Sequence, residues 1–232
     1  MRPTILAFDV FGTVADWHVS VAREVARRAP DIDAGAFARD WRAGYQPAMD
    51  RVARGEWAWQ TIDALHRRLL DPLLTRYGLA HWSKAERADF NNVWHRLDAW
   101  PDAKAGIARL REQFICVTLS NGNVSLLVEQ ARHAGLTWDT VLSAELFGHF
   151  KPHPATYLGV AELFACRPAD VCMVATHQSD LDAARDHGLL TAYIERPMEF
   201  GADAPKTASP SSANDWHATD LENLAHQLTA RS

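Results

Sequence analysis

Polar side chains that can perform nucleophilic chemistry recur at points where apolar stretches of the sequence end. These side chains are Asp9, Thr13, Ser120, Asn121, Lys151, His177 and Asp180. A carboxylate can act as a nucleophile, and a lysine can offset negative charge on a substrate. The set therefore favours an enzyme site built from carboxylate, hydroxyl, amide and lysine groups, provided that the fold brings the segments together.

The apolar stretches before these residues predict the strands of a parallel sheet. Continuous apolar runs cover 4–8, 114–119, 171–175 and 191–194, and a short strand is expected near 141–144. Such runs are typical of strands buried on both faces. Helical stretches separate them, at about 102–112, 123–134, 154–165 and 179–187, with 219–229 at the end. We therefore predict an α/β fold with a doubly wound parallel sheet, whose strand ends gather the polar residues.

The region between the first two strands has a different pattern. Ile62, Leu65, Leu69 and Leu73 recur at helical spacing, and the segment 83–86 has the form of a helix capping box. This pattern predicts an all-helical insertion at 16–97. The segment 197–218 is rich in Pro, Gly and Ser and is expected to be irregular surface chain.

Composition argues against several classes of partner. The 232 residues include 24 Lys and Arg against 29 Asp and Glu, a net charge of −5, so no overall positive field attracts nucleic acid or anionic lipid. No run approaches the roughly 18 apolar residues that a membrane span needs. Cys116, Cys166 and Cys172 form no Cys-x-x-Cys pair. We expect a cytoplasmic protein without nucleic-acid or membrane partners.

The ordered motifs resemble those of the haloacid dehalogenase superfamily. Its first motif, an aspartate followed by x-x-Gly-Thr, is matched by Asp9, Gly12 and Thr13. The second, third and fourth motifs resemble 119–122, 151–152 and the segment that ends at Asp180. The resemblance implies an α/β core domain, formed by 1–15 and 98–232, and a helical cap domain at 16–97 that closes over Asp9.

Most members of that superfamily are magnesium-dependent phosphatases, and two positions speak against that branch. Such phosphatases carry a second aspartate two residues after the first, which protonates the leaving group, and this chain has Phe11 at that position. They also carry a magnesium-binding aspartate where this chain has Ala175, five residues before Asp180. Alanine offers no ligand to Mg²⁺, which prefers carboxylate oxygen. We therefore expect neither a metal ion nor another cofactor.

The chain is more similar to the metal-free L-2-haloacid dehalogenases. Their Asp-x-aromatic-Gly-Thr motif includes Phe11, and their Lys-Pro-x-Pro-x-x-Tyr motif runs from Lys151 to Tyr157. Their halide-accepting arginine falls on Arg42, although Arg39, or a solvated helix face, is an alternative. Phe11, Arg42 and Tyr157 are thus candidate substrate-binding residues.

The same resemblance implies a role for each remaining polar residue. It makes Asp9 the nucleophile, and it assigns the positioning of that nucleophile and of the substrate carboxylate to Thr13, Ser120 and Lys151. Asn121 would help to cradle halide. Asp180 would position or activate water.

The fourth motif departs from that of the best-known dehalogenases, which carry serine and asparagine where this chain has Ala175 and His177. An unperturbed histidine has a pKa near 6.5, so His177 is a candidate base for the hydrolytic water, or alternatively a wall of the pocket. The changed lining suggests haloacetates, fluoroacetate included, as substrates to test.

The function expected from this resemblance is hydrolysis of short (S)-2-haloacids to 2-hydroxyacids and halide through an ester on Asp9, in a homodimer. The alternatives are a phosphatase-like hydrolase of the same superfamily and a non-catalytic protein that retains the fold.

Overall fold

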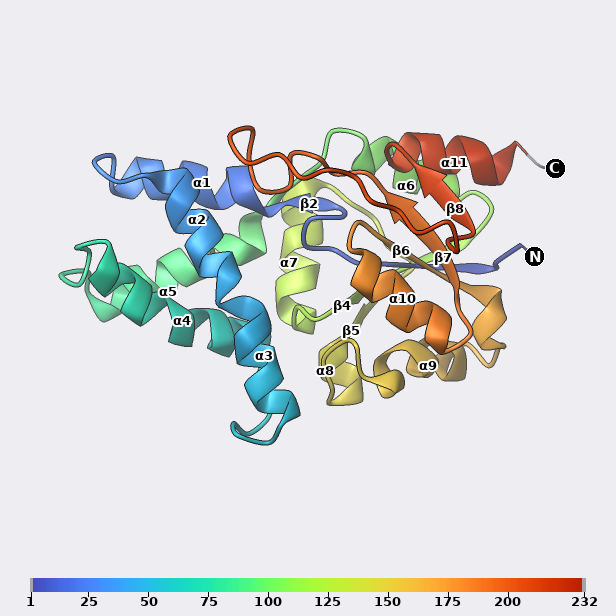
Figure 1. The fold of residues 1–232 in the computed structure, drawn as a ribbon, viewed down its shortest axis with the longest axis horizontal. Coiled ribbons are helices and arrows are strands. Elements are labelled where there is room, and N and C mark those ends of the chain that lie inside the picture. Colours follow the sequence, from blue (N-terminus) through green and yellow to red (C-terminus); the bar gives the residue numbers. More distant parts are fainter. Residues whose placement is uncertain (1, 231–232) are drawn as a thin grey trace.

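A six-stranded parallel sheet forms the centre of the molecule, which a computed structural model describes for residues 2–230 (Figure 1). The strand order is β5-β4-β1-β6-β7-β8, and every neighbouring pair is parallel. The strands are β5 Thr140–Ser143, β4 Ile115–Ser120, β1 Ile5–Phe8, β6 Val171–Ala175, β7 Leu190–Ile194 and β8 Trp216–Ala218. The predicted doubly wound α/β fold is confirmed.

The central strand β1 is buried on both faces, as its uniformly apolar sequence predicts. Leu6 and Phe8 belong to a core cluster that includes apolar residues of α6 Ala103–Leu110 and α11 Leu221–Thr229. Ile5 and Ala7 point to the opposite face and share a cluster with residues of α9 Pro154–Leu163 and α10 Gln178–Asp186. Because Phe8 pairs with Thr118 of β4 and Val174 of β6, the three strands end at the same edge.

A separate group of helices lies beyond this edge, on the left in Figure 1. It consists of α1 Trp17–Arg28, α2 Ala34–Ala43, α3 Tyr45–Ala53, α4 Ile62–Arg76, α5 Lys84–Asn91 and the 3-10 helix η1 Asn92–Arg96. Two short antiparallel strands, β2 Ala15–Asp16 and β3 Asp98–Ala99, connect it to the sheet. The predicted capping box is present, since Ser83 and Glu86 bond each other's backbone. These bounds support 16–97 as the extent of the proposed cap domain.

Two parts of the fold differ from the sequence-based expectation. The helix α8 Ala144–Phe147 was not predicted. The remaining helices of the described chain are α7 Val124–Ala134 and the 3-10 helix η2 Pro168–Asp170. The segment 197–218, expected to be irregular surface chain, ends in the strand β8 and contains the fully buried Glu199. The expectation was wrong there because turn-forming residues report local conformation and not burial.

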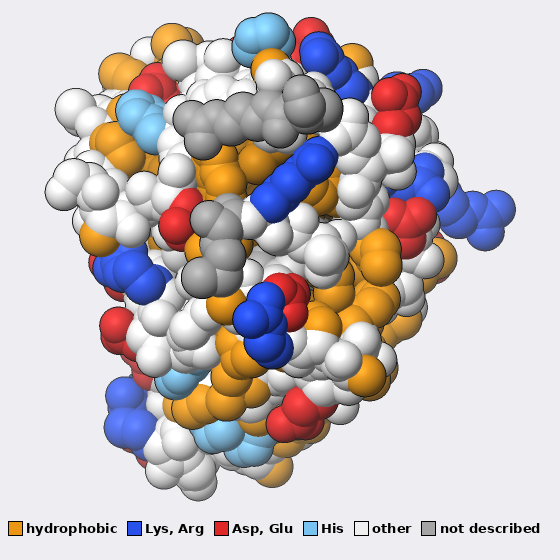
Figure 2. Space-filling view, turned by 90° about the vertical axis from the view of Figure 1, so that its right-hand side faces the viewer, with side chains coloured by type: hydrophobic (Ala, Val, Ile, Leu, Met, Phe, Trp, Pro, Cys, Tyr) orange, Lys and Arg blue, Asp and Glu red, His pale blue; other side chains and the backbone are white. Residues whose placement is uncertain are grey.

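No helix in residues 2–230 is both long and apolar enough to cross a membrane. On the face that lies farthest from the helical group, acidic and basic side chains are interspersed (Figure 2). Charge of one sign therefore does not gather on this face.

Candidate active site

The carboxylate of Asp9 lies directly beyond the end of β1 and is held at both oxygens. Its Oδ1 accepts a hydrogen bond from Lys151 Nζ at 3.0 Å. Its Oδ2 accepts one from Thr13 Oγ1 at 2.8 Å and lies 3.3 Å from His177 Nδ1. Asp9 is only 7% exposed, and burial alone would raise its pKa, but the charge of Lys151 and the contact with His177 hold the pKa below its usual value. The group is therefore an ionised, fixed nucleophile candidate.

A tight turn returns the chain to Asp9 after β1. The backbone amides of Val14 and Ala15 both donate to Val10 O, and Gly12 adopts a positive φ of 89° that favours glycine. The turn brings the hydroxyl of Thr13 back to Asp9, and the same hydroxyl accepts a hydrogen bond from Thr176 N at 2.9 Å. The first and fourth motifs are thus joined through one hydroxyl.

Lys151 links Asp9 to a second carboxylate. Its ammonium group also donates to Asp180 Oδ2, while Asp180 Oδ1 accepts from Tyr157 Oη at 2.7 Å. Burial alone would lower the pKa of Lys151, but Asp180 and Asp9 together raise it, so the lysine stays charged. The backbone amide of Lys151 donates to Asn121 Oδ1 at 2.7 Å, which ties the third motif to the second.

His177 lies between two carboxylates. Its Nδ1 faces Asp9, and its Nε2 lies 2.7 Å from Oε1 of the fully buried Glu199. Burial alone would lower the pKa of His177, but Glu199 and Asp9 raise it to about 9. The ring is therefore a cation at neutral pH while Asp9 is ionised, and the unperturbed pKa near 6.5 assumed from the sequence is wrong for this state.

A cavity of about 390 Å³ opens above Asp9 between the sheet edge and the helical group. Its lining consists of Asp9, Phe11, Arg42, Tyr45, Gln46, Met49, Asn121, Lys151, Pro152, Tyr157, His177, Ser179 and Asp180. Arg42 contributes a guanidinium group that lies 4.1 Å from the centre of the Tyr45 ring. Among residues 2–230, Arg42 forms no ion pair, whereas Arg39 is paired with Asp203. Of the cavity's cations, Arg42 is thus the unpaired one as far as the described chain shows, and the alternative Arg39 lies outside the lining.

The structure brings eight of the ten predicted site residues to the cavity wall and leaves Thr13 and Ser120 behind it. Ser120 is fully buried, and its Oγ accepts from Gly122 N at 3.2 Å. Asn121 lies on the wall, with its Nδ2 3.2 Å from Met49 Sδ. Ser120 therefore shapes the loop that presents Asn121.

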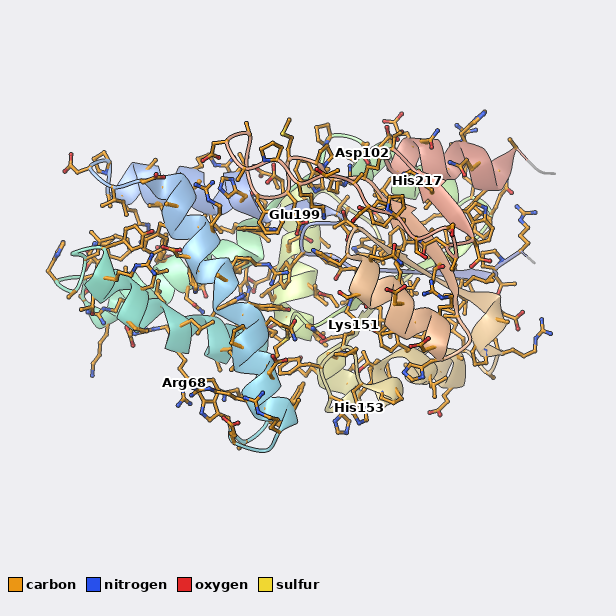
Figure 3. All side chains as sticks on the ribbon, viewed as in Figure 1. Arg68, Asp102, Lys151, His153, Glu199 and His217 are labelled. Atoms are coloured by element: carbon orange, nitrogen blue, oxygen red, sulfur yellow. The ribbon has the colours of Figure 1, made fainter. Side chains whose placement is uncertain are left out.

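Six residues at the site were not among the predicted site residues: Tyr45, Gln46, Met49, Pro152, Ser179 and Glu199. Met49 follows Tyr45 by four residues on α3, so a helical face was a usable signal for this pair. No comparable signal marks Glu199, which lies in the turn-rich segment after β7. Figure 3 shows Glu199 and Lys151 at the junction between the sheet and the helices α1–α5.

The side chains around Asp9 do not form a binding site for Mg²⁺. Both oxygens of Asp9 already accept hydrogen bonds, and both oxygens of Asp180 are occupied by Lys151 and Tyr157. The ring that faces Asp9 is the cationic His177, which would repel a metal ion at that position. No group of three or more His, Cys, Asp or Glu residues within 2–230 has an arrangement that could hold a metal ion.

Comparisons with known proteins give one matching family and several similar solved structures. A family model described as haloacid dehalogenase-like hydrolase matches residues 3–188. A solved L-2-haloacid dehalogenase is 42% identical, with a TM-score of 0.92, and the alignment covers 98% of this chain and 100% of that one. A solved defluorinating L-2-haloacid dehalogenase is 38% identical, with a TM-score of 0.94 and coverage of 97% and 95%. The L-2-haloacid dehalogenase of Xanthobacter autotrophicus, solved with chloropropionic acid covalently bound, is 25% identical, with a TM-score of 0.85 and full coverage of both chains.

Proposed function

The chain belongs to the haloacid dehalogenase-like hydrolase family, and we propose that it hydrolyses the carbon–halogen bond of short (S)-2-haloacids and haloacetates. One observation carries this proposal. A buried, ionised Asp9, backed by Lys151, faces a small cavity that is also lined by Arg42, a cation with no ion-pair partner within residues 2–230. A carboxylate nucleophile and a site for a leaving anion are the two groups that such a displacement requires.

In the first step, an oxygen of Asp9 attacks C2 of the haloacid, a C–O bond forms, and the C–X bond breaks with its electron pair leaving on halide. Two negative charges about 5 Å apart repel by roughly 3 kcal/mol at an effective dielectric of 20. The ammonium group of Lys151, 3.0 Å from Asp9 Oδ1, offsets this repulsion as the substrate carboxylate approaches.

The leaving halide needs hydrogen-bond donors but no proton. The guanidinium group of Arg42 and the amide of Asn121 both line the cavity and can donate to it. This requirement is compatible with Phe11, which offers no acid; its ring packs edge-on against Tyr45, with ring centres 6.4 Å apart. An acid at this position, as phosphate ester cleavage uses, is unnecessary for halide release.

The second step opens the ester at the carboxyl carbon of Asp9. Water adds there, the bond from that carbon to the substrate oxygen breaks, and a 2-hydroxyacid leaves. Over both steps, the haloacid and water give hydroxyacid, halide and one proton, with inversion at C2. The covalently bound chloropropionic acid in the Xanthobacter autotrophicus enzyme supports a covalent intermediate of this kind.

Release of chloride and fluoride from chloroacetate, fluoroacetate and L-2-chloropropionate tests the proposal. We expect turnover by the wild-type protein and none by Asp9→Asn, which keeps the shape of the side chain. Folding of the variant is checked by circular dichroism. Fluoroacetate is included because one similar structure is that of a defluorinating enzyme. No halide from any of the three acids would contradict the proposal.

The alternative functions predict different results. A phosphatase-like hydrolase would release phosphate from phosphate esters only with Mg²⁺, and a non-catalytic protein would show no turnover that depends on Asp9.

A homodimer is also part of the proposal, through the resemblance to the dehalogenases, and light scattering tests it. The three cysteines are free thiols, which supports the proposed cytoplasmic location.

A further inference from the structure

A chain of three groups runs from Asp9 through the half-buried His177 to the fully buried Glu199. The two ring nitrogens of His177 face one carboxylate each, at 3.3 Å for Asp9 and 2.7 Å for Glu199. Glu199 is 0% exposed, and its second oxygen accepts from Lys206 Nζ. Lys206 in turn donates to Thr176 Oγ1 at 2.9 Å. The carboxylate that orients the ring is therefore itself fixed in place.

This order of groups is that of a nucleophile, a histidine and an orienting carboxylate, the arrangement through which histidine acts as a base in acyl-transfer enzymes. The side chain of His177 is 28% exposed and lines the cavity, so water can reach it. Asp180, the other candidate base, accepts hydrogen bonds from Lys151 and Tyr157 at its two oxygens and holds the lysine in place.

On the basis of the proposed function, we propose that His177 Nδ1 is the general base that activates water for hydrolysis of the Asp9 ester, and that Glu199 is the positioning residue that orients its ring.

The reaction itself prepares the base. While Asp9 is ionised, it supports the positive charge of His177 from 3.3 Å. Once Asp9 becomes a neutral ester, that support is lost, whereas the nearby cations Arg42 and Lys151 remain. Glu199 is then the protein carboxylate that still faces the ring and opposes the loss of its proton. We therefore expect His177 to release its Nδ1 proton to solvent in the ester state.

Two other charged groups near the His177 ring have the same ion-pair partner when Asp9 is ionised and when it is an ester. Lys206 is paired with Glu199, and Asp180 is paired with Lys151, so neither changes its partner when the ester forms. The charge that changes next to His177 is that of Asp9. Ester formation is thus the event that switches the ring from a cation to a base.

The protons balance over the cycle. The proton that His177 releases after ester formation is the one proton that dehalogenation produces. In hydrolysis, water adds to the carboxyl carbon of Asp9 while His177 Nδ1 takes a proton from it. Collapse expels the hydroxyacid oxygen, which takes the second proton of the added water, and this restores ionised Asp9 beside cationic His177.

The test separates ester formation from ester hydrolysis. His177→Asn and Glu199→Gln are mixed with chloroacetate, chloride is measured over time, and the intact mass of the protein is recorded. For His177→Asn, we expect about one chloride per protein, a carboxymethyl ester on the peptide that contains Asp9, and ester hydrolysis slowed by about 10²–10⁴-fold.

Glu199→Gln tests whether the negative charge of Glu199 acts on His177 or whether Glu199 only supports the fold. We expect the ester to accumulate in this variant as well. The rate of ester hydrolysis in single turnover rises with pH as His177 loses its proton, and removal of the Glu199 charge is expected to move the midpoint of this rise to lower pH. A midpoint unchanged from that of the wild type would overturn the role of Glu199.

A matched control comes from a second histidine–carboxylate pair, outside the cavity lining. His95 Nε2 lies 3.0 Å from Asp63 Oδ1, so Asp63→Asn removes the same kind of charge from a similar pair. We expect no ester to accumulate in this control. Equal accumulation in Asp63→Asn, or steady turnover by His177→Asn without an ester, would overturn the inference. If the wild type releases no halide at all, the proposed function fails instead.

Discussion

A single methyl group added at Gly12 tests how closely the first motif and Glu199 are packed. A Cβ atom at this position would lie 2.3 Å from Glu199 Oε1 and 2.8 Å from its Cδ. Glu199 cannot move into solvent to relieve this contact, because it is fully buried and bonded to His177 and Lys206. We therefore expect Gly12→Ala to destabilise the fold and to displace Glu199 from His177.

The loss in free energy of unfolding that we expect for Gly12→Ala has two parts. The positive φ of 89° at Gly12 costs an alanine about 1–2 kcal/mol. Forcing an atom into a packed interior adds about 1–3 kcal/mol. The total of about 2–5 kcal/mol corresponds to a loss of roughly 4–20 °C in Tm for a protein of this size. Thermal unfolding followed by circular dichroism measures it.

Gly78→Ala is the matched control, because Gly78 also has a positive φ, of 73°, but a Cβ there would meet no atom within 4 Å. We expect it to cost only the backbone part, about 1–2 kcal/mol. In a Glu199→Ala background, the overlap is removed, so Gly12→Ala should then cost no more than Gly78→Ala. Equal costs for the two glycine variants in the wild-type background would refute the reasoning.

Three further outcomes are expected. Arg42→Lys keeps the charge but loses the planar set of donors, so kcat/KM for chloride release should fall by about 10–100-fold, equivalent to about 1.5–3 kcal/mol. Tyr157→Phe removes the 2.7 Å hydrogen bond to Asp180 and should lower the free energy of unfolding in urea by about 1–3 kcal/mol. The pKa of His177 is raised from 6.5 to about 9, so its ion pairs stabilise the fold fully below pH 6.5, and this contribution is lost as the pH rises through about 9. Urea unfolding at pH 6 and pH 9.5 should show this loss in the wild type and not in His177→Asn.

The sheet and most of the site were predictable because their signals are local. A strand buried on both faces must be apolar throughout, so β1, β4, β6 and β7 stand out as continuous runs. Parallel strands that alternate with helices end at one edge, and this places Asp9, Asn121 and Asp180 together without any knowledge of side-chain geometry.

Other features depend on contacts that no local pattern contains. The strand β8 has only three residues, Trp216–Ala218, one of which is exposed, so it carries no apolar run. Glu199 lies 22 residues after His177 along the chain, in a segment of turn-forming residues, yet it largely determines the charge of that histidine. A charge state set by a tertiary contact cannot be read from the residue type alone.

The charges at the site explain why it suits an anionic substrate whose leaving group is also an anion. Each of three buried or half-buried carboxylates has a cationic partner. Lys151 pairs with both Asp9 and Asp180, and Glu199 pairs with His177 and Lys206. The lining cation without such a partner, among the residues that the structure describes, is Arg42. A bound haloacid brings one negative charge to match it. When Asp9 becomes a neutral ester, its negative charge passes to the halide while the carboxylate of the bound acid keeps its own, so the displacement itself leaves the total charge of the site unchanged. The barrier then includes no cost for creating net charge in a half-buried cavity, and the positive charges that stabilise the departing halide are in place before the reaction begins.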